Sequence, residues 1–140
     1  MFSEEKANHA VAFVRSLKHT KGDWRGRPFN LQPFQEKIIR DLFGTVNADG
    51  TRQYRTAYVE EPRKNGKSEL AAAIALKLLT ADGEGGAEIY GAAGDRDQAA
   101  LVFDVAAEMV RQHDALSKRC KVVDHKKRIV VPATNSFYHA

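Results

Sequence analysis

The sequence predicts an α/β fold with three layers and a mainly parallel sheet, and two observations predict it. Short runs rich in Val, Ile, Thr and Tyr alternate with longer segments of helix-forming residues. This order is typical of parallel strands joined by crossover helices. A polar turn that ends in Gly66-Lys67-Ser68 separates one such run from the helical segment after it. The 140 residues are enough for one domain at most.

Two helices are expected ahead of the first strand. Apolar residues recur at helical spacing over 4–17, with Ser3 placed to cap that helix. A second helix is expected over 33–43, because it begins with a proline, which suits a first helical turn, and Gly44 follows as a stop. We expect both helices to form a lead-in over residues 1–50 that packs alongside the core.

Residues 51–140 are expected to form the core of strands and crossover helices. A strand at 56–59 should enter the polar turn. The helix that leaves it should begin at Gly66-Lys67-Ser68 and continue through the Ala- and Leu-rich run at 69–79. Asp95 and Asp97 are placed to cap and charge the start of the next helix, which is a better reading than a metal site. The other expected elements are strands at 88–93, 121–124, 128–131 and from 137, and a helix at 96–112.

The polar turn at 60–66 and the residues after it have the layout of a phosphate-binding loop. Backbone N–H groups and a helix N-terminus converge in such a loop, where they bind phosphate oxygens. Lys67 would bridge the β- and γ-phosphates, and the Ser68 hydroxyl would be a ligand of Mg²⁺. Glu61 stands where the usual pattern begins with glycine, and a chance Gly-Lys-Ser in a charged turn is the alternative reading.

Composition narrows the class of protein further. The chain is 43% hydrophobic and carries a net charge of +4, which fits a polyanion partner or simply a solvated basic surface. One cysteine, Cys120, excludes an internal disulfide and fits a reducing compartment. The polar start is unlike a signal peptide, and no apolar run approaches a membrane span, so we expect a soluble intracellular protein. The five scattered histidines receive no role.

Three segments, at 26–35, 62–68 and 87–99, resemble in the same order the large terminase subunit of tailed bacteriophages, and within it the HK97-like branch. The resemblance covers nearly the whole chain. It implies a partial P-loop NTPase of the ASCE, or RecA-like, type and a motor that uses ATP and Mg²⁺ to drive double-stranded DNA into the capsid. It also implies a portal protein, a small terminase subunit and a homo-oligomeric ring as partners, in the cytoplasm of the bacterial host.

The resemblance also implies site residues. Gln35 would read adenine, because its amide is both donor and acceptor, with Phe29 or Phe34 against the base. Arg63 can reach phosphate oxygens bidentately and would act with Lys67 in catalysis. The alternatives are an exposed helix glutamine, two core phenylalanines, and a surface arginine facing solvent or DNA. The complete implied ATP-binding set is Gln35, Arg63, Lys64, Asn65, Gly66, Lys67 and Ser68.

Hydrolysis also needs an apolar strand ending in Asp-Glu, and the chain offers no match. Leu101–Asp104 lies inside a helical pattern, and Val122–Asp124 reads as an edge strand running into a turn. The Walker B region and the acidic residues of a nuclease domain are therefore expected to be absent from 1–140, which would be the N-terminal portion of the ATPase domain. We expect this portion to bind ATP weakly and to hydrolyse it negligibly.

Two other functions remain open at this point. A helicase-like ATPase fragment would share the broad fold, although Asn65 stands where Gly-Thr is usual in that class. A non-catalytic DNA-binding or assembly module would use basic side chains on phosphates. Its candidate residues are Arg25, Arg27, Lys126, Lys127 and Arg128.

Overall fold

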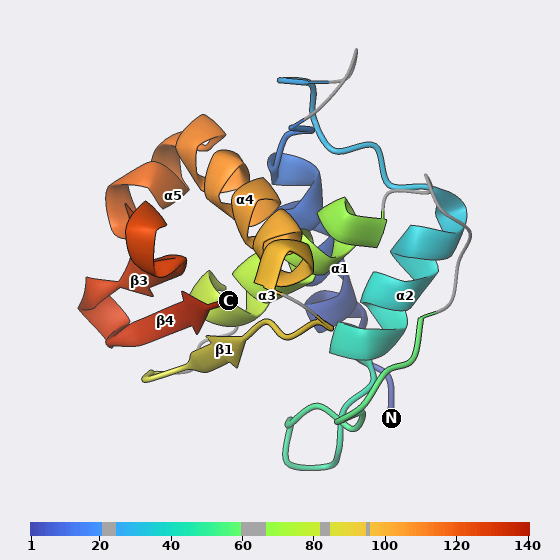
Figure 1. The fold of residues 1–140 in the computed structure, drawn as a ribbon. Helices are drawn as coiled ribbons and strands as arrows, with labels where there is room; N and C mark the ends of the chain where they lie inside the picture. Colours follow the sequence, from blue (N-terminus) through green and yellow to red (C-terminus); the bar gives the residue numbers. More distant parts are fainter. Residues whose placement is uncertain (21–24, 60–66, 82–84, 95) are drawn as a thin grey trace.

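A computed structural model of the chain (Figure 1) describes residues 1–20, 25–59, 67–81, 85–94 and 96–140, without the side chains of residues 67 and 96. None of the helices in these ranges is long and apolar enough to cross a membrane. The elements are α1 (Glu4–Ser16), α2 (Pro33–Gly44), α3 (Lys67–Thr80), β1 (Glu88–Tyr90), α4 (Arg96–Gln112), α5 (Asp114–Arg119), β2 (Lys121–Val123), β3 (Arg128–Val131) and β4 (Ser136–His139).

The sheet has the strand order β1-β4-β3-β2 and is mixed. The α/β class is confirmed, but the expected predominance of parallel pairs is wrong: β1 and β4 run parallel, whereas β3 pairs with β2 and β4 antiparallel. Short 3₁₀ turns join β2 to β3 and β3 to β4, each closed by a residue with positive φ, Lys127 and Asn135. Connections this short reverse the direction of the chain, so the strands they join are antiparallel. β1 and β4 can run parallel because the chain between them takes the long path through α4 and α5.

The strand expected at 56–59 is not formed. A strand exists through its ladder of hydrogen bonds, and none of the described segments pairs with these residues. Tyr58 is 86% exposed, so its β propensity is not supported by packing. The strand expected at 88–93 ends early, at Tyr90.

One face of the sheet carries the buried side chains. Ile129 and Tyr138 are direct partners on this face, and both are almost fully buried. The ring of Phe103 from α4 lies 6.1 Å from that of Tyr138, so α4 covers this face. On the opposite face Tyr90 is 65% exposed. Within the described ranges, the expected third layer over that face is therefore missing.

The two N-terminal helices form as predicted and pack alongside, with α1 against both α2 and α3 (Figure 1). Ser3 caps α1 by accepting a hydrogen bond from the Lys6 N–H at 3.2 Å. At the end of α2, a Cβ on Gly44 would stand 2.8 Å from both the Ala7 Cβ and the Phe2 ring. Glycine is therefore needed here for the close approach of α1 and α2. It does not itself end the helix, because Gly44 has no positive φ and the C-cap is Thr45.

Candidate nucleotide site

The predicted phosphate loop leads into α3, which begins at Lys67. Its first turn has N–H groups without intrahelical partners, the donors that bind anions at a helix start. Ser68 lies in this turn and is exposed. Of the predicted site residues, Arg63, Lys64, Asn65 and Gly66, and the side chain of Lys67, lie outside the described residues.

Packing holds α3 firmly behind this first turn. Helix-forming Ala and Leu residues make up most of the helix. Four of them have at most 2% of their surface exposed: Leu70, Ala72, Ala73 and Leu76. Truncating a leucine buried this deeply costs about 2–5 kcal/mol of folding free energy. The exposed start of α3 is thus presented to solvent by a helix whose remaining turns belong to the core.

A histidine without a role in the sequence analysis contacts this turn. His19 Nδ1 lies 2.6 Å from Glu69 Oε2, and the Asn30 N–H donates to His19 Nε2 at 2.9 Å. Since Nε2 accepts, the ring proton is on Nδ1, which donates to the Glu69 carboxylate. The imidazole also stacks on Phe29, with centroids 4.9 Å apart and planes at 21°.

Gln35 lies in the first turn of α2 and is 3% exposed, so the reading of an exposed helix glutamine is wrong. Its Oε1 accepts a hydrogen bond from the Gln32 N–H at 3.0 Å. That bond fixes the orientation of the side-chain amide. Of the two phenylalanines considered for the base, Phe34 is 44% exposed next to Gln35, whereas Phe29 is buried under His19.

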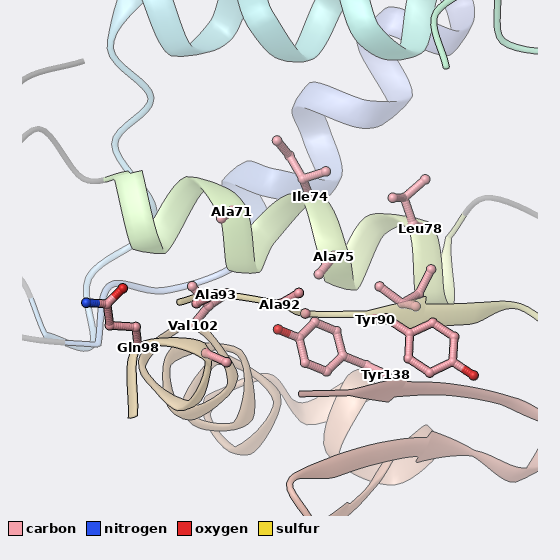
Figure 2. Close-up of a pocket in the computed structure, with 13 residues that line it drawn as sticks. Ala71, Ile74, Ala75, Leu78, Tyr90, Ala92, Ala93, Gln98, Val102 and Tyr138 are labelled. Atoms are coloured by element: carbon pink, nitrogen blue, oxygen red, sulfur yellow. The ribbon is translucent and has the colours of Figure 1, made fainter. Parts of the chain in front are cut away.

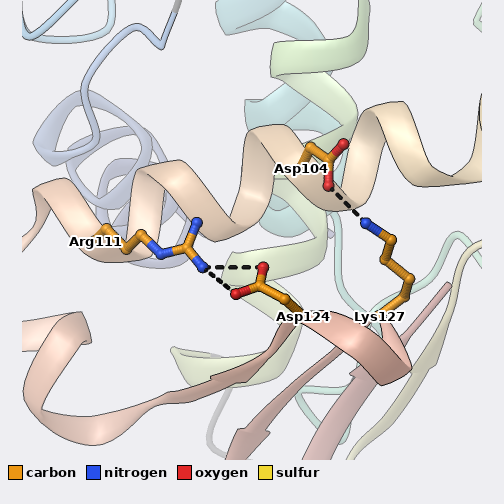
Figure 3. Close-up of polar contacts among 4 residues, drawn as sticks. All are labelled: Asp104, Arg111, Asp124 and Lys127. Carbon is orange, nitrogen blue, oxygen red and sulfur yellow. Dashed lines mark hydrogen bonds and ion pairs between the residues drawn. The ribbon is translucent and has the colours of Figure 1, made fainter.

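The aspartates at the incomplete Asp-Glu matches have basic partners instead (Figure 3). Asp104 lies within α4 and pairs with Lys127 at 3.3 Å, and Asp124 follows the edge strand β2 and pairs with Arg111 at 2.8 Å. Asp97 lies in the first turn of α4, as predicted, while position 95 is outside the described ranges. In the described part of the chain, no group of three or more His, Cys, Asp or Glu residues is placed to hold a metal ion.

A groove of about 300 Å³ lies between α3, α4 and the chain that follows β1 (Figure 2). Aliphatic and aromatic side chains line most of it, including Ile74, Leu78, Val102 and Tyr138, and none of the lining residues that the structure describes is charged. Phosphate binding requires charged or N–H donors directed at one point, so the described side chains of this groove do not by themselves form a phosphate site.

An α/β fold with a mixed sheet, and with a helix that starts at Lys67-Ser68 directly after the polar sequence 60–66, fits the class of P-loop NTPase-like domains. The comparisons with known proteins give the family. Residues 33–140 match the model of the terminase large subunit, ATPase domain, and the chain belongs to this family.

Two relatives agree with the family model. The terminase large subunit of Enterobacteria phage HK97 is 30% identical over 137 residues, which cover 96% of this chain and 26% of that protein. The crystal structure of the HK97 bacteriophage large terminase matches 100% of this chain and 27% of its own, with 28% identity and a TM-score of 0.80. The resemblance seen in the sequence is confirmed, and the chain spans about a quarter of these relatives.

Proposed function

We propose that this chain is the ATP-binding part of a phage DNA-packaging motor, which couples ATP hydrolysis to translocation of double-stranded DNA. The observation that carries the proposal is the start of α3 at Lys67, with an exposed Ser68, in a member of the terminase ATPase family. A helix N-terminus with a lysine and a hydroxyl at its first positions suits a nucleotide phosphate together with Mg²⁺.

We assign the roles within the site as follows. Backbone N–H groups of residues 64–66 would cradle the phosphates, and Lys67 and Arg63 would stabilise the charge that develops during phosphoryl transfer. Ser68 would be a ligand of Mg²⁺. Gln35 would read the adenine edge through its amide N–H donors, since its Oε1 already accepts the Gln32 N–H.

The proposed domain boundaries are a helical lead-in over 1–50 and a P-loop core over 51–140. We propose that the 140 residues alone bind ATP weakly and hydrolyse it negligibly, because Lys67 and Ser68 are present but the sequence offers no apolar strand that ends in Asp-Glu. In the longer protein, the partners would be DNA, a portal protein, a small terminase subunit and other copies of the motor in a ring, within the bacterial cytoplasm.

Membership of the terminase family decides against a helicase-like fragment. The alternative of a basic DNA-binding module is not favoured either, because several of its cationic groups have partners. Arg25 pairs with Glu108, Lys127 pairs with Asp104, and the guanidinium of Arg128 lies 4.3 Å from the centre of the Phe137 ring.

Titration of the chain with ATP and Mg²⁺ tests the proposal. Wild type should bind, and Lys67→Ala should weaken binding at least about tenfold, because a charge-assisted contact to phosphate is lost. Lys118→Ala, which removes an exposed charge from α5, is the matched control and should bind like wild type. Equal affinity of wild type and Lys67→Ala, with both folded by circular dichroism, would contradict the proposal.

A further inference from the structure

The first turn of α3 contains a feature that works against an anion site. Glu69 is the third residue of the helix, counted from Lys67. A glutamate at this position reaches back to the N–H groups at the helix start in a capping box, and its charge is attracted there by the helix dipole. These N–H groups are the donors that the proposed phosphate site needs, so an unengaged Glu69 carboxylate would compete with the nucleotide for them.

His19 provides another partner for this carboxylate. Its Nδ1–H donates to Glu69 Oε2 at 2.6 Å, and the side chains are only 15% and 19% exposed. Two further contacts fix the ring: the Asn30 N–H holds Nε2 as an acceptor, and Phe29, itself buried, stacks on one side. The imidazole is therefore set in both tautomer and orientation before any ligand binds, and its donor points at Glu69.

We propose that His19 is a positioning residue for nucleotide binding, which engages the Glu69 carboxylate and so leaves the N–H groups at the start of α3 to phosphate. The inference rests on the proposed nucleotide site. His19 does not touch the ligand in this role. It acts through Glu69, from a segment that lies 50 residues earlier in the chain.

A reversal experiment separates this role from a general contribution to folding. His19→Ala should weaken binding of ATP and Mg²⁺ about two- to fivefold, the effect of one charge near a helix N-terminus. The double variant His19→Ala/Glu69→Ala should bind like wild type, because the competing carboxylate is gone. If the double variant binds as weakly as His19→Ala, or if His19→Ala has no effect, the proposal is overturned.

Two conservative variants keep the test decisive if His19→Ala fails to fold. Asn at position 19 places an amide donor where Nδ1 stands, whereas Gln reaches the position of Nε2. His19→Asn should bind ATP and Mg²⁺ with the wild-type affinity, and His19→Gln should bind them more weakly than wild type. The opposite order, or equal affinities, overturns the positioning role. ¹⁵N NMR of the imidazole should show the neutral Nδ1–H tautomer, and an Nε2–H tautomer would also overturn it.

The outcomes for the two proposals differ. If Lys67→Ala abolishes binding but the His19 variants leave it unchanged, only the positioning role is lost. If wild type shows no binding that depends on Lys67, the nucleotide site is wrong and the positioning role falls with it.

Discussion

Arg111 and Asp124 join α4 to the turn that follows β2: one guanidinium nitrogen, Nη2, lies 3.0 and 2.8 Å from the two carboxylate oxygens. Asp104 lies seven residues earlier on α4. It accepts a hydrogen bond from the ammonium of Lys127, which closes the turn between β2 and β3. Each of the two segments thus supplies one acid and one base (Figure 3). The two pairs together favour a single register of the β2–β3 hairpin on α4.

The first prediction concerns this contact. Asp124→Asn should lower the free energy of unfolding by only about 0.5 kcal/mol, because both side chains are well exposed and solvent screens the pair. It should leave the affinity for ATP and Mg²⁺ unchanged, because the role of Asp124 is to hold the β2–β3 hairpin against α4. Urea denaturation and nucleotide titration of the same protein check both parts. A large loss of Mg²⁺-dependent binding would show that this carboxylate belongs to the metal site.

The second prediction concerns the contact between α1 and α2. Gly44→Ala should destabilise the fold by about 1–3 kcal/mol, because the added Cβ would meet Ala7 and the Phe2 ring at 2.8 Å. Gly85→Ala is the matched control: no atom of the described residues lies within 4 Å of its Cβ position, and its φ is not positive. Chemical denaturation of both variants gives the comparison, and equal stabilities would contradict the steric reading.

The third prediction separates the two roles of Gln35. Gln35→Glu keeps an oxygen that can accept the Gln32 N–H, but it loses the amide donor needed for adenine. It should therefore keep the contact to the Gln32 N–H, at a cost in stability because the carboxylate is buried, and lose its preference for ATP over GTP. Gln35→Ala should lose the same preference and also about 1 kcal/mol of stability, since the contact at the helix start is gone. Competition between ATP and GTP, with thermal unfolding, measures both. An unchanged preference in both variants would remove Gln35 from the base site.

The fourth prediction is a dependence on pH. Burial raises the pKa of the Cys120 thiol above its ordinary value of 9.0, and burial likewise raises the pKa of the Tyr138 hydroxyl above 10.0. In both cases folding favours the neutral form. The stability from these groups is complete below the unfolded pKa and is lost as pH rises through the folded pKa.

Stability should accordingly fall above about pH 9, and Cys120→Ala should flatten the first part of that fall. Denaturation at a series of pH values measures it. At pH 8 a thiol reagent should modify Cys120 much more slowly in the native chain than in urea, because the thiolate is the reactive form and burial disfavours it. Equal rates would show that the thiol is accessible.

Elements with strong local signals were predicted well. Periodic apolar residues and the cap Ser3 gave α1, Pro33 and Gly44 bounded α2, and α4 has the range expected for it. The short helix α5 was missed. Its N-cap is His113, whose Nδ1 accepts the Leu116 N–H at 3.2 Å, and histidine is not among the residues that usually mark a helix start.

Features that depend on distant partners were predicted poorly. The Thr, Tyr and Val at 56–59 favour a strand, but β propensity is realised only when a neighbouring strand pairs and packs, and none of the described segments does. The contact between His19 and Glu69 leaves no pattern in the sequence, because its members are 50 positions apart and neither belongs to a recognisable motif.

The sequence by itself determined the α/β class, the terminase family and the start of a helix at Lys67, because caps, periodicity and motif spacing act within a few residues. Only the tertiary structure decided that the sheet is mixed, that Gln35 is buried with an oriented amide, and that His19 engages Glu69. These depend on which segments come together in space, and that follows from packing of the whole chain rather than from any local stretch of it.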